Sequence, residues 1–232
     1  MAEINVLASG GFGAAMRALL PGFESGGAHT VVTTGGGSMG DSPTSIPSRM
    51  QRDEAFDVVI MASGGLDELI RLGKVRAGSR VDLARSMIGV VVRAGAPHPD
   101  ISSAEAVKRT LIAAQSVAFS NSASGVYLLG LFERMGIGEQ IAAKRSQGTP
   151  GPVAAMVARG EAAIGFQQVS ELLPVPGIDY LGPLPDEIQE VTIFAAGIPT
   201  SAREPEAART IIAYLSAPAA AETIRETGME PC

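Results

Sequence analysis

Residues 116–137 read SVAFSNSASGVYLLGLFERMGI, and this stretch decides how the rest of the chain is interpreted. It starts with a short apolar run, Val117–Phe119, which is typical of a buried strand. It ends with apolar residues at helical spacing, from Val126 to Met135. The residues between them are small and mostly carry hydroxyls, which is the chemistry of a helix N-cap. The stretch therefore predicts a strand, a turn and a helix whose first N–H groups could hold an anion.

Turns of the same composition follow other predicted strands. Upstream of residue 116, strand-like runs alternate with helix-like segments, which indicates a parallel sheet covered by helices. In such sheets, ligands bind at the carboxyl ends of the strands. The alternative is that these are ordinary tight turns. The turns are Ser9, Gly10 and Gly11; Gly36, Gly37 and Ser38; Ser120, Asn121, Ser122 and Ser124; and Thr149–Gly151.

Two further strands are expected to cross between halves of the molecule. One is Met87–Val92, entered through Leu83–Ser86, and the other is Val191–Ala195. The fold class is therefore α/β with two lobes, each a mostly parallel sheet flanked by helices, and the two crossing strands form a hinge. The predicted lobes are residues 1–84 plus 190–232 and residues 85–189, with a ligand cleft between them. A brief strand is expected over residues 141–145.

Composition excludes several classes of partner. The chain has 232 residues, a net charge of −6 and a pI near 5, which argue against nucleic acid. No segment reaches the roughly 18 apolar residues that a membrane span requires. One cysteine and two histidines without ligand spacing predict no metal and no cofactor. The N-terminus lacks a signal peptide, so we expect a cytoplasmic protein, or a periplasmic one if a signal was removed.

Six segments carry a resemblance to a known family. They are INVLASGGFGAAM (4–16), FDVVIMAS (56–63), GLDELIRLG (65–73), ARSMIGVVVR (84–93), SGVY (124–127) and VARGEAAIGFQQVSEL (157–172). In this order and spacing they resemble the type II periplasmic binding proteins, specifically the molybdate-binding-like branch. The resemblance covers nearly the whole chain and implies a two-lobed fold that binds a small anion. The oligomeric state stays open.

The resemblance also implies ligand positions. The family's first-helix serine falls on Gly11, its tyrosine falls on Gln168, and a backbone N–H ligand falls on Ser124. Its second serine lies in a loop that is longer here, so Ser38, Ser42 and Ser45 are all candidates. Because two side-chain ligands are replaced, an organic acid fits better than molybdate. An arginine can bind a carboxylate through two hydrogen bonds, so Arg85 is an expected binding residue. Ser86, with its hydroxyl, and Gln167, with its amide, are expected binding residues as well.

Two segments narrow the resemblance further. DSPTSIPSR (41–49) and GFQQVSEL (165–172) resemble the aconitate isomerase-like subgroup. This implies isomerisation of a small polycarboxylate by allylic proton transfer, which requires a base and a pocket that stabilises an anion. The candidate proton-transfer residues are Asp41, Ser42, Ser45 and Glu171. The alternative is a non-catalytic solute-binding protein for molybdate or an organic anion, which would serve an ABC transporter only if it is exported.

Overall fold

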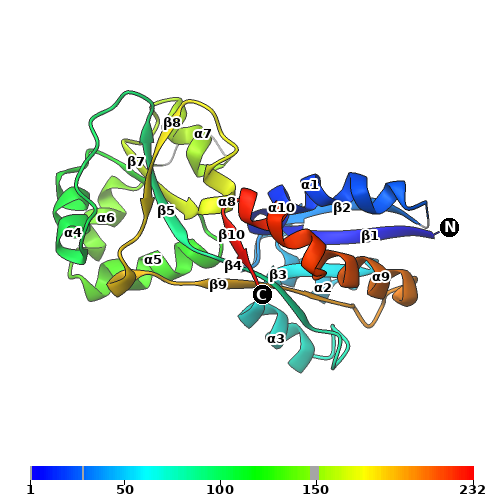
Figure 1. Cartoon of the computed structure of the whole chain (residues 1–232). Coiled ribbons are helices and arrows are strands. Elements are labelled where there is room, and N and C mark those ends of the chain that lie inside the picture. Colours follow the sequence, from blue (N-terminus) through cyan, green and yellow to red (C-terminus); the bar gives the residue numbers. More distant parts are fainter. Residues whose placement is uncertain (1, 28, 147–151) are drawn as a thin grey trace. The chain divides into compact units, whose positions relative to one another are not determined.

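The computed structural model describes residues 2–27, 29–146 and 152–232 (Figure 1). The chain divides into two compact units, and the predicted α/β fold class is confirmed. Unit 1 is Met1–Ser86 with Thr192–Cys232, and unit 2 is Met87–Val191. The chain therefore passes from one unit to the other twice.

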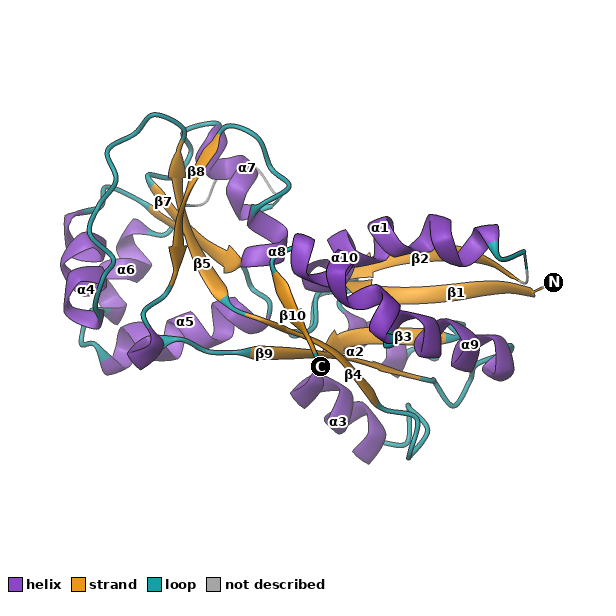
Figure 2. Ribbon diagram, viewed as in Figure 1, coloured by secondary structure: helices purple, strands orange, loops and turns teal. Residues whose placement is uncertain are grey.

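Unit 1 is built on a six-stranded sheet in the order β10-β4-β9-β3-β1-β2 (Figure 2). Its strands are β1 (Ala2–Ser9), β2 (His29–Gly36), β3 (Val58–Ala62), β4 (Val81–Ser86), β9 (Thr192–Gly197) and β10 (Met229–Pro231). Its helices are α1 (Gly10–Ser25), α2 (Ile46–Gln51), α3 (Ser63–Arg71), α9 (Pro205–Leu215), the 3-10 turn η2 (Pro218–Ala220) and α10 (Ala221–Glu226).

The central strands of this sheet are buried on both faces, because their side chains alternate between two helical layers, whereas the edge strand β2 is partly exposed. On β1, Val6 and Ala8 pack into one core with α1, α9 and α10, whereas Leu7 packs into a second core with α2 and α3. Figure 1 shows α1 lying along β1 and β2. Burial on both faces explains why the sequence of β3 reads as an uninterrupted apolar run.

Unit 2 is built on a four-stranded sheet in the order β6-β7-β5-β8. One face packs with α4, α5 and α6, and the other packs with α7 and α8. Its strands are β5 (Ile88–Arg93), β6 (Val117–Phe119), β7 (Ile164–Gln168) and β8 (Ile178–Pro183). Its helices are α4 (Ala104–Ala113), α5 (Ala123–Arg134), α6 (Gly138–Lys144), α7 (Val153–Ala158), α8 (Val169–Leu172) and the 3-10 turn η1 (Asp186–Ile188).

The structure corrects three local expectations. Residues 141–145 fall mostly within helix α6, where Ile141 packs into the core of unit 2 while Ala142 and Ala143 face solvent. The expected crossing strand Met87–Val92 and its entry Leu83–Ser86 form two strands, because β4 ends at Ser86, β5 starts at Ile88, and the two belong to different sheets. Both sheets are mixed and not mostly parallel. In unit 1 the returning strand β9 lies antiparallel between β3 and β4, and among the described strands of unit 2 β5 pairs antiparallel with both β7 and β8, while β6 and β7 pair in parallel.

No helix in the described ranges is both long enough and apolar enough to cross a bilayer.

Candidate functional site

In unit 2, the two parallel strands β6 and β7 end at the same edge of the sheet. Phe119 pairs with Phe166, so Ser120 and Gln167 are the next residues of the two strands. Helices α5 and α8 begin within a few residues of this edge. The edge therefore collects backbone N–H groups, hydroxyls and amides, which is the usual composition of an anion site in α/β proteins.

The turn before α5 is held together by its own serines. The Ser120 hydroxyl accepts a hydrogen bond from the Ser122 N–H at 3.2 Å and lies 3.3 Å from the Ser124 hydroxyl. Ser122 is the N-cap residue, yet its side chain makes no capping bond to the helix. The positive end of the α5 dipole is therefore available to an anion.

Gly125 allows α5 to start this close to the strand. A Cβ atom at this position would lie 1.7 Å from the backbone oxygen of Ser120. Asn121, in the same turn, is held by Arg145, whose Nη2 donates to the Asn121 Oδ1 at 2.6 Å. The Arg145 guanidinium also stacks over the Phe119 ring, 4.1 Å from its centroid. These contacts give the turn a defined shape.

Glu171 stands out among the proposed proton-transfer residues. It lies in α8, and burial raises the pKa of its carboxyl to about 7, while a side-chain hydrogen bond from Gln167 acts in the opposite direction. Gln167 is itself buried, and its Oε1 accepts a hydrogen bond from the Val153 N–H at the start of α7, at 3.1 Å. A carboxyl that titrates near neutral pH suits general acid–base chemistry, and perturbed groups of this kind gather at functional sites.

Gln167→Met is expected to raise the pKa of Glu171 above about 7. Methionine fills a similar volume but removes the amide donor that stabilises the carboxylate, so the desolvation of the carboxyl is no longer opposed. The measurement is a carbon-13 NMR titration of the glutamate side-chain carboxyls, assigned with Glu171→Gln.

Gln168→Met is the matched control for that titration. Consecutive side chains of a strand point to opposite faces, so Gln168 lies on the other face of β7. This variant is expected to leave the pKa of Glu171 near 7. Equal Glu171 pKa values in the wild type and in Gln167→Met would contradict the assignment of the hydrogen bond.

Unit 1 brings a second set of predicted residues to the carboxyl edge of its own sheet. Ser9 pairs with Gly36, so the turns that follow β1 and β2 lie side by side. Ser9 is the N-cap of α1 and makes no side-chain capping bond. Gly11 is required by packing, because a Cβ atom there would lie 2.1 Å from the Phe194 ring.

Ser38 is buried and acts within the fold of unit 1. Its hydroxyl accepts a hydrogen bond from the Ala62 N–H, directly before α3, at 3.0 Å. Ser38 also lines a pocket of about 280 Å³ together with Gly64 and Gly65 in the first turn of α3. Sequence reasoning missed this helix start, although the sequence Ser63-Gly64-Gly65 directly after an apolar strand was a usable signal.

Arg85 and Ser86 lie at the same edge of the unit 1 sheet, on β4. Strands β3 and β9 separate β4 from β1, so Arg85 is about 14 Å from β1 at the usual strand spacing. Arg85 is exposed. Ser86 is fully buried, and within the described residues its hydroxyl has no hydrogen-bond partner.

The remaining predicted residues lie in the loop before α2. Ser45 caps α2: its hydroxyl donates to the Gly40 carbonyl at 2.8 Å and accepts from the Ser48 N–H at 3.3 Å. Ser42 is exposed and its hydroxyl lies 3.2 Å from that of Thr44, and Asp41 is exposed as well. Their catalytic roles stay predictions.

Two expectations have no structural test. The turn Thr149–Gly151 lies outside the described residues. That the turns of the two units face one cleft stays a prediction. Across residues 2–27, 29–146 and 152–232, the structure contains no group of three or more histidine, cysteine or acidic residues that could hold a metal ion.

Comparison with known proteins identifies relatives of the whole chain. The family model for bacterial extracellular solute-binding proteins matches residues 4–230. A protein from Pseudomonas sp. named aconitate isomerase is 45% identical over 229 residues, covering 98% of this chain and 87% of the relative. The resemblance stated from the sequence is confirmed, both for the binding-protein family and for the isomerase-like subgroup.

Solved structures show the same fold at low identity. The Azotobacter vinelandii periplasmic molybdate-binding protein superposes with a TM-score of 0.79 at 19% identity, covering 97% of this chain and 98% of that protein. Peb3 from Campylobacter jejuni superposes with a TM-score of 0.70 at 13% identity, covering 98% of this chain and 99% of that protein. These similarities establish the fold alone.

Proposed function

Because the chain belongs to the bacterial extracellular solute-binding protein family, we propose that it binds a small polycarboxylate and, within that family, isomerises it as an aconitate isomerase. The observation that carries the proposal is the 45% identity to an aconitate isomerase over nearly the whole chain. Identity at this level along 98% of the sequence supports a shared reaction more strongly than a shared fold does.

The reaction moves a carbon–carbon double bond by one position. A base removes a proton from the methylene carbon of aconitate, the electron pair spreads over the allylic unit and its carboxylates, and a proton returns to the other end. Atoms and charge balance without an oxidant or a reductant. The protein must therefore supply one group that exchanges a proton near neutral pH and a set of donors that stabilise the added negative charge.

Unit 2 offers both kinds of group. Glu171 is the proposed proton-transfer residue, since its pKa of about 7 lets it accept and return a proton at neutral pH. The first turn of α5, with Ser120, Ser122 and Ser124, is the proposed donor set for one substrate carboxylate. Gln168 is proposed to contact another carboxylate.

Unit 1 supplies further proposed binding residues. The first turn of α1, after Ser9, offers N–H groups from a second helix start. Arg85 is the proposed partner of a carboxylate, since it is exposed on β4 and a guanidinium can form two parallel hydrogen bonds. Ser86, whose hydroxyl is buried, follows Arg85 directly in the chain. A further proposed binding turn in unit 1 consists of Gly36, Gly37 and Ser38.

The proposal is tested by incubating the purified protein with cis-aconitate and with trans-aconitate in deuterated water. Deuterium is expected to enter the methylene position, and the two isomers are expected to interconvert in the proton NMR spectrum. Binding of either acid without exchange would overturn the catalytic proposal and leave a binding protein for that acid. If neither isomer binds or reacts, the proposal that aconitate is the substrate is overturned as well.

A second candidate function is a non-catalytic solute-binding protein of an ABC transporter, for molybdate or an organic anion. The match to the solute-binding family favours it. A thermal-shift comparison of molybdate with aconitate separates the two functions, because a ligand at one hundred times its Kd adds about 2.7 kcal/mol of stability. Stabilisation by molybdate alone would favour transport. Cytoplasmic or periplasmic location stays a prediction.

A further inference from the structure

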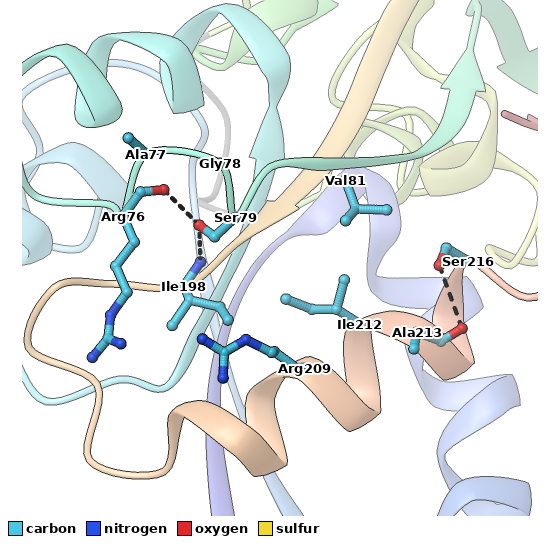
Figure 3. Close-up of a pocket in the computed structure, with 10 residues that line it drawn as sticks. All are labelled: Arg76, Ala77, Gly78, Ser79, Val81, Ile198, Arg209, Ile212, Ala213 and Ser216. Carbon is cyan, nitrogen blue, oxygen red and sulfur yellow. Dashed lines mark hydrogen bonds between the residues drawn. The ribbon is translucent and has the colours of Figure 1, made fainter.

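A pocket far from the proposed site lies in unit 1, beneath helix α9. It has a volume of about 430 Å³, which is within the range of small-molecule sites. Val81, the first residue of β4, lines it, whereas Ser86 ends the same strand about 17 Å away at the usual rise per residue. The lining residues are Arg76, Ala77, Gly78, Ser79, Val81, Ile198, Arg209, Ile212, Ala213 and Ser216 (Figure 3).

The charged residues that line this pocket are all basic. Two arginines line it and no acidic residue does, in a chain whose net charge is −6. Figure 3 shows the side chains of Arg76 and Arg209 reaching toward the same side of the pocket. An anion in the pocket would be attracted by both guanidinium charges.

The two lining arginines have fewer ion-pair partners than the nearby Arg80. Arg80, four residues after Arg76, forms ion pairs with Asp67 at 2.6 Å and Asp82 at 2.8 Å. Arg76 donates from its Nε to the Pro199 carbonyl at 3.3 Å, and among the described residues it forms no ion pair. Arg209 pairs with Glu206, a side chain that is 85% exposed, and exposed pairs contribute little.

The rest of the lining is apolar or already hydrogen-bonded. Ser79 donates to the Arg76 carbonyl at 2.8 Å and accepts from the Ile198 N–H at 3.0 Å. Ser216 donates to the Ala213 carbonyl at 3.3 Å. What remains to meet a ligand is the pair of guanidinium groups and an apolar surface formed by Val81, Ile198, Ile212 and Ala213.

We propose that this pocket binds a small organic acid that has one carboxylate and an apolar body. The carboxylate lies against the guanidinium groups of Arg76 and Arg209, which match its planar geometry. The body lies on the apolar surface and is removed from water. A tricarboxylate would place charged groups on that surface at a desolvation cost, so this site is distinct in chemistry from the proposed isomerase site.

The test titrates the nitrogen-15-labelled full chain with sodium hexanoate and follows the backbone amide resonances. The expected result is saturable shifts at Ala77, Gly78 and Ala213, with acetate and hexanol binding more weakly because each lacks one half of the ligand. Arg76→Met and Arg209→Met are expected to raise the Kd about tenfold to a hundredfold, the range for hydrogen bonds to charged groups.

Three further variants keep the proposal falsifiable. Glu206→Gln is expected to lower the Kd, because it releases Arg209 from its partner. Ala213→Phe, which fills the pocket from α9, is expected to abolish binding. Arg17 is an exposed arginine on α1, and Arg17→Met is the control, which is expected to leave the Kd for hexanoate unchanged. Shifts that map elsewhere, or an unchanged Kd in both arginine variants, would overturn the proposal.

Discussion

Replacing Glu171 with glutamine is expected to lower the turnover number for aconitate isomerisation by about 10²- to 10⁴-fold, the usual contribution of a positioned general acid–base group. Glutamine keeps the size of the side chain but loses the negative charge and the ability to take up and return a proton. Wild-type turnover is expected to rise with pH through about 7, because proton abstraction requires the carboxylate and the pKa of Glu171 is about 7. Glu171→Gln is expected to lack this inflection.

A stability measurement separates loss of chemistry from loss of folding. The pKa of Glu171 is raised in the folded protein from its usual value near 4.5 to about 7, so the native state binds this proton more tightly than the unfolded chain. The contribution of this group to stability is present below pH 4.5 and is lost as the pH rises through about 7. Glu171→Gln is therefore expected to have a higher free energy of unfolding than the wild type above pH 7.

Two variants complete the design. Asp41→Asn tests the exposed carboxylate of the loop before α2, and retained exchange in Glu171→Gln together with lost exchange in Asp41→Asn would reassign the base. Glu226→Gln, an exposed glutamate at the end of α10, controls for the removal of one negative charge. Full activity of Glu171→Gln would sink the proton-transfer role.

Gly125→Ala is expected to destabilise the protein by about 3 kcal/mol or more, at or above the upper end of the usual overpacking range. The added Cβ would lie 1.7 Å from the Ser120 backbone oxygen, and backbone cannot rotate away as a side-chain tip can. This cost exceeds the roughly 1 kcal/mol that alanine gains over glycine inside a helix. The free energy of unfolding from urea titration, followed by circular dichroism, measures the difference.

Gly130→Ala is the matched control because it makes the same change in the same helix. A Cβ atom there meets only the terminal Nη1 of Arg134 at 3.3 Å, and that flexible side chain can move. Its free energy of unfolding is expected to equal or slightly exceed that of the wild type. Equal stability of the two variants would show that the turn between β6 and α5 relaxes around the added methyl group.

The local sequence determined much of the secondary structure and the family. The apolar run of β3 and the helical spacing in α5 are local patterns, so both elements were predictable from the residues alone. The order and spacing of six short sequence segments were enough to indicate the resemblance to the binding-protein family. The sequence also marked Glu171 as a candidate base, but only alongside Asp41, Ser42 and Ser45.

Only the tertiary structure shows how the surroundings of those candidates differ. The pKa of Glu171 depends on the burial of its carboxyl in the folded unit and on Gln167, whose other hydrogen bond comes from the Val153 N–H at the start of α7. Ser45 is taken up by capping α2, which depends on how its loop folds back to Gly40. Strand β9 enters the unit 1 sheet from the far end of the chain, so the mixed pairing could not follow from local pattern. Burial and partner choice are set by contacts between residues far apart in sequence, and a local pattern does not contain them.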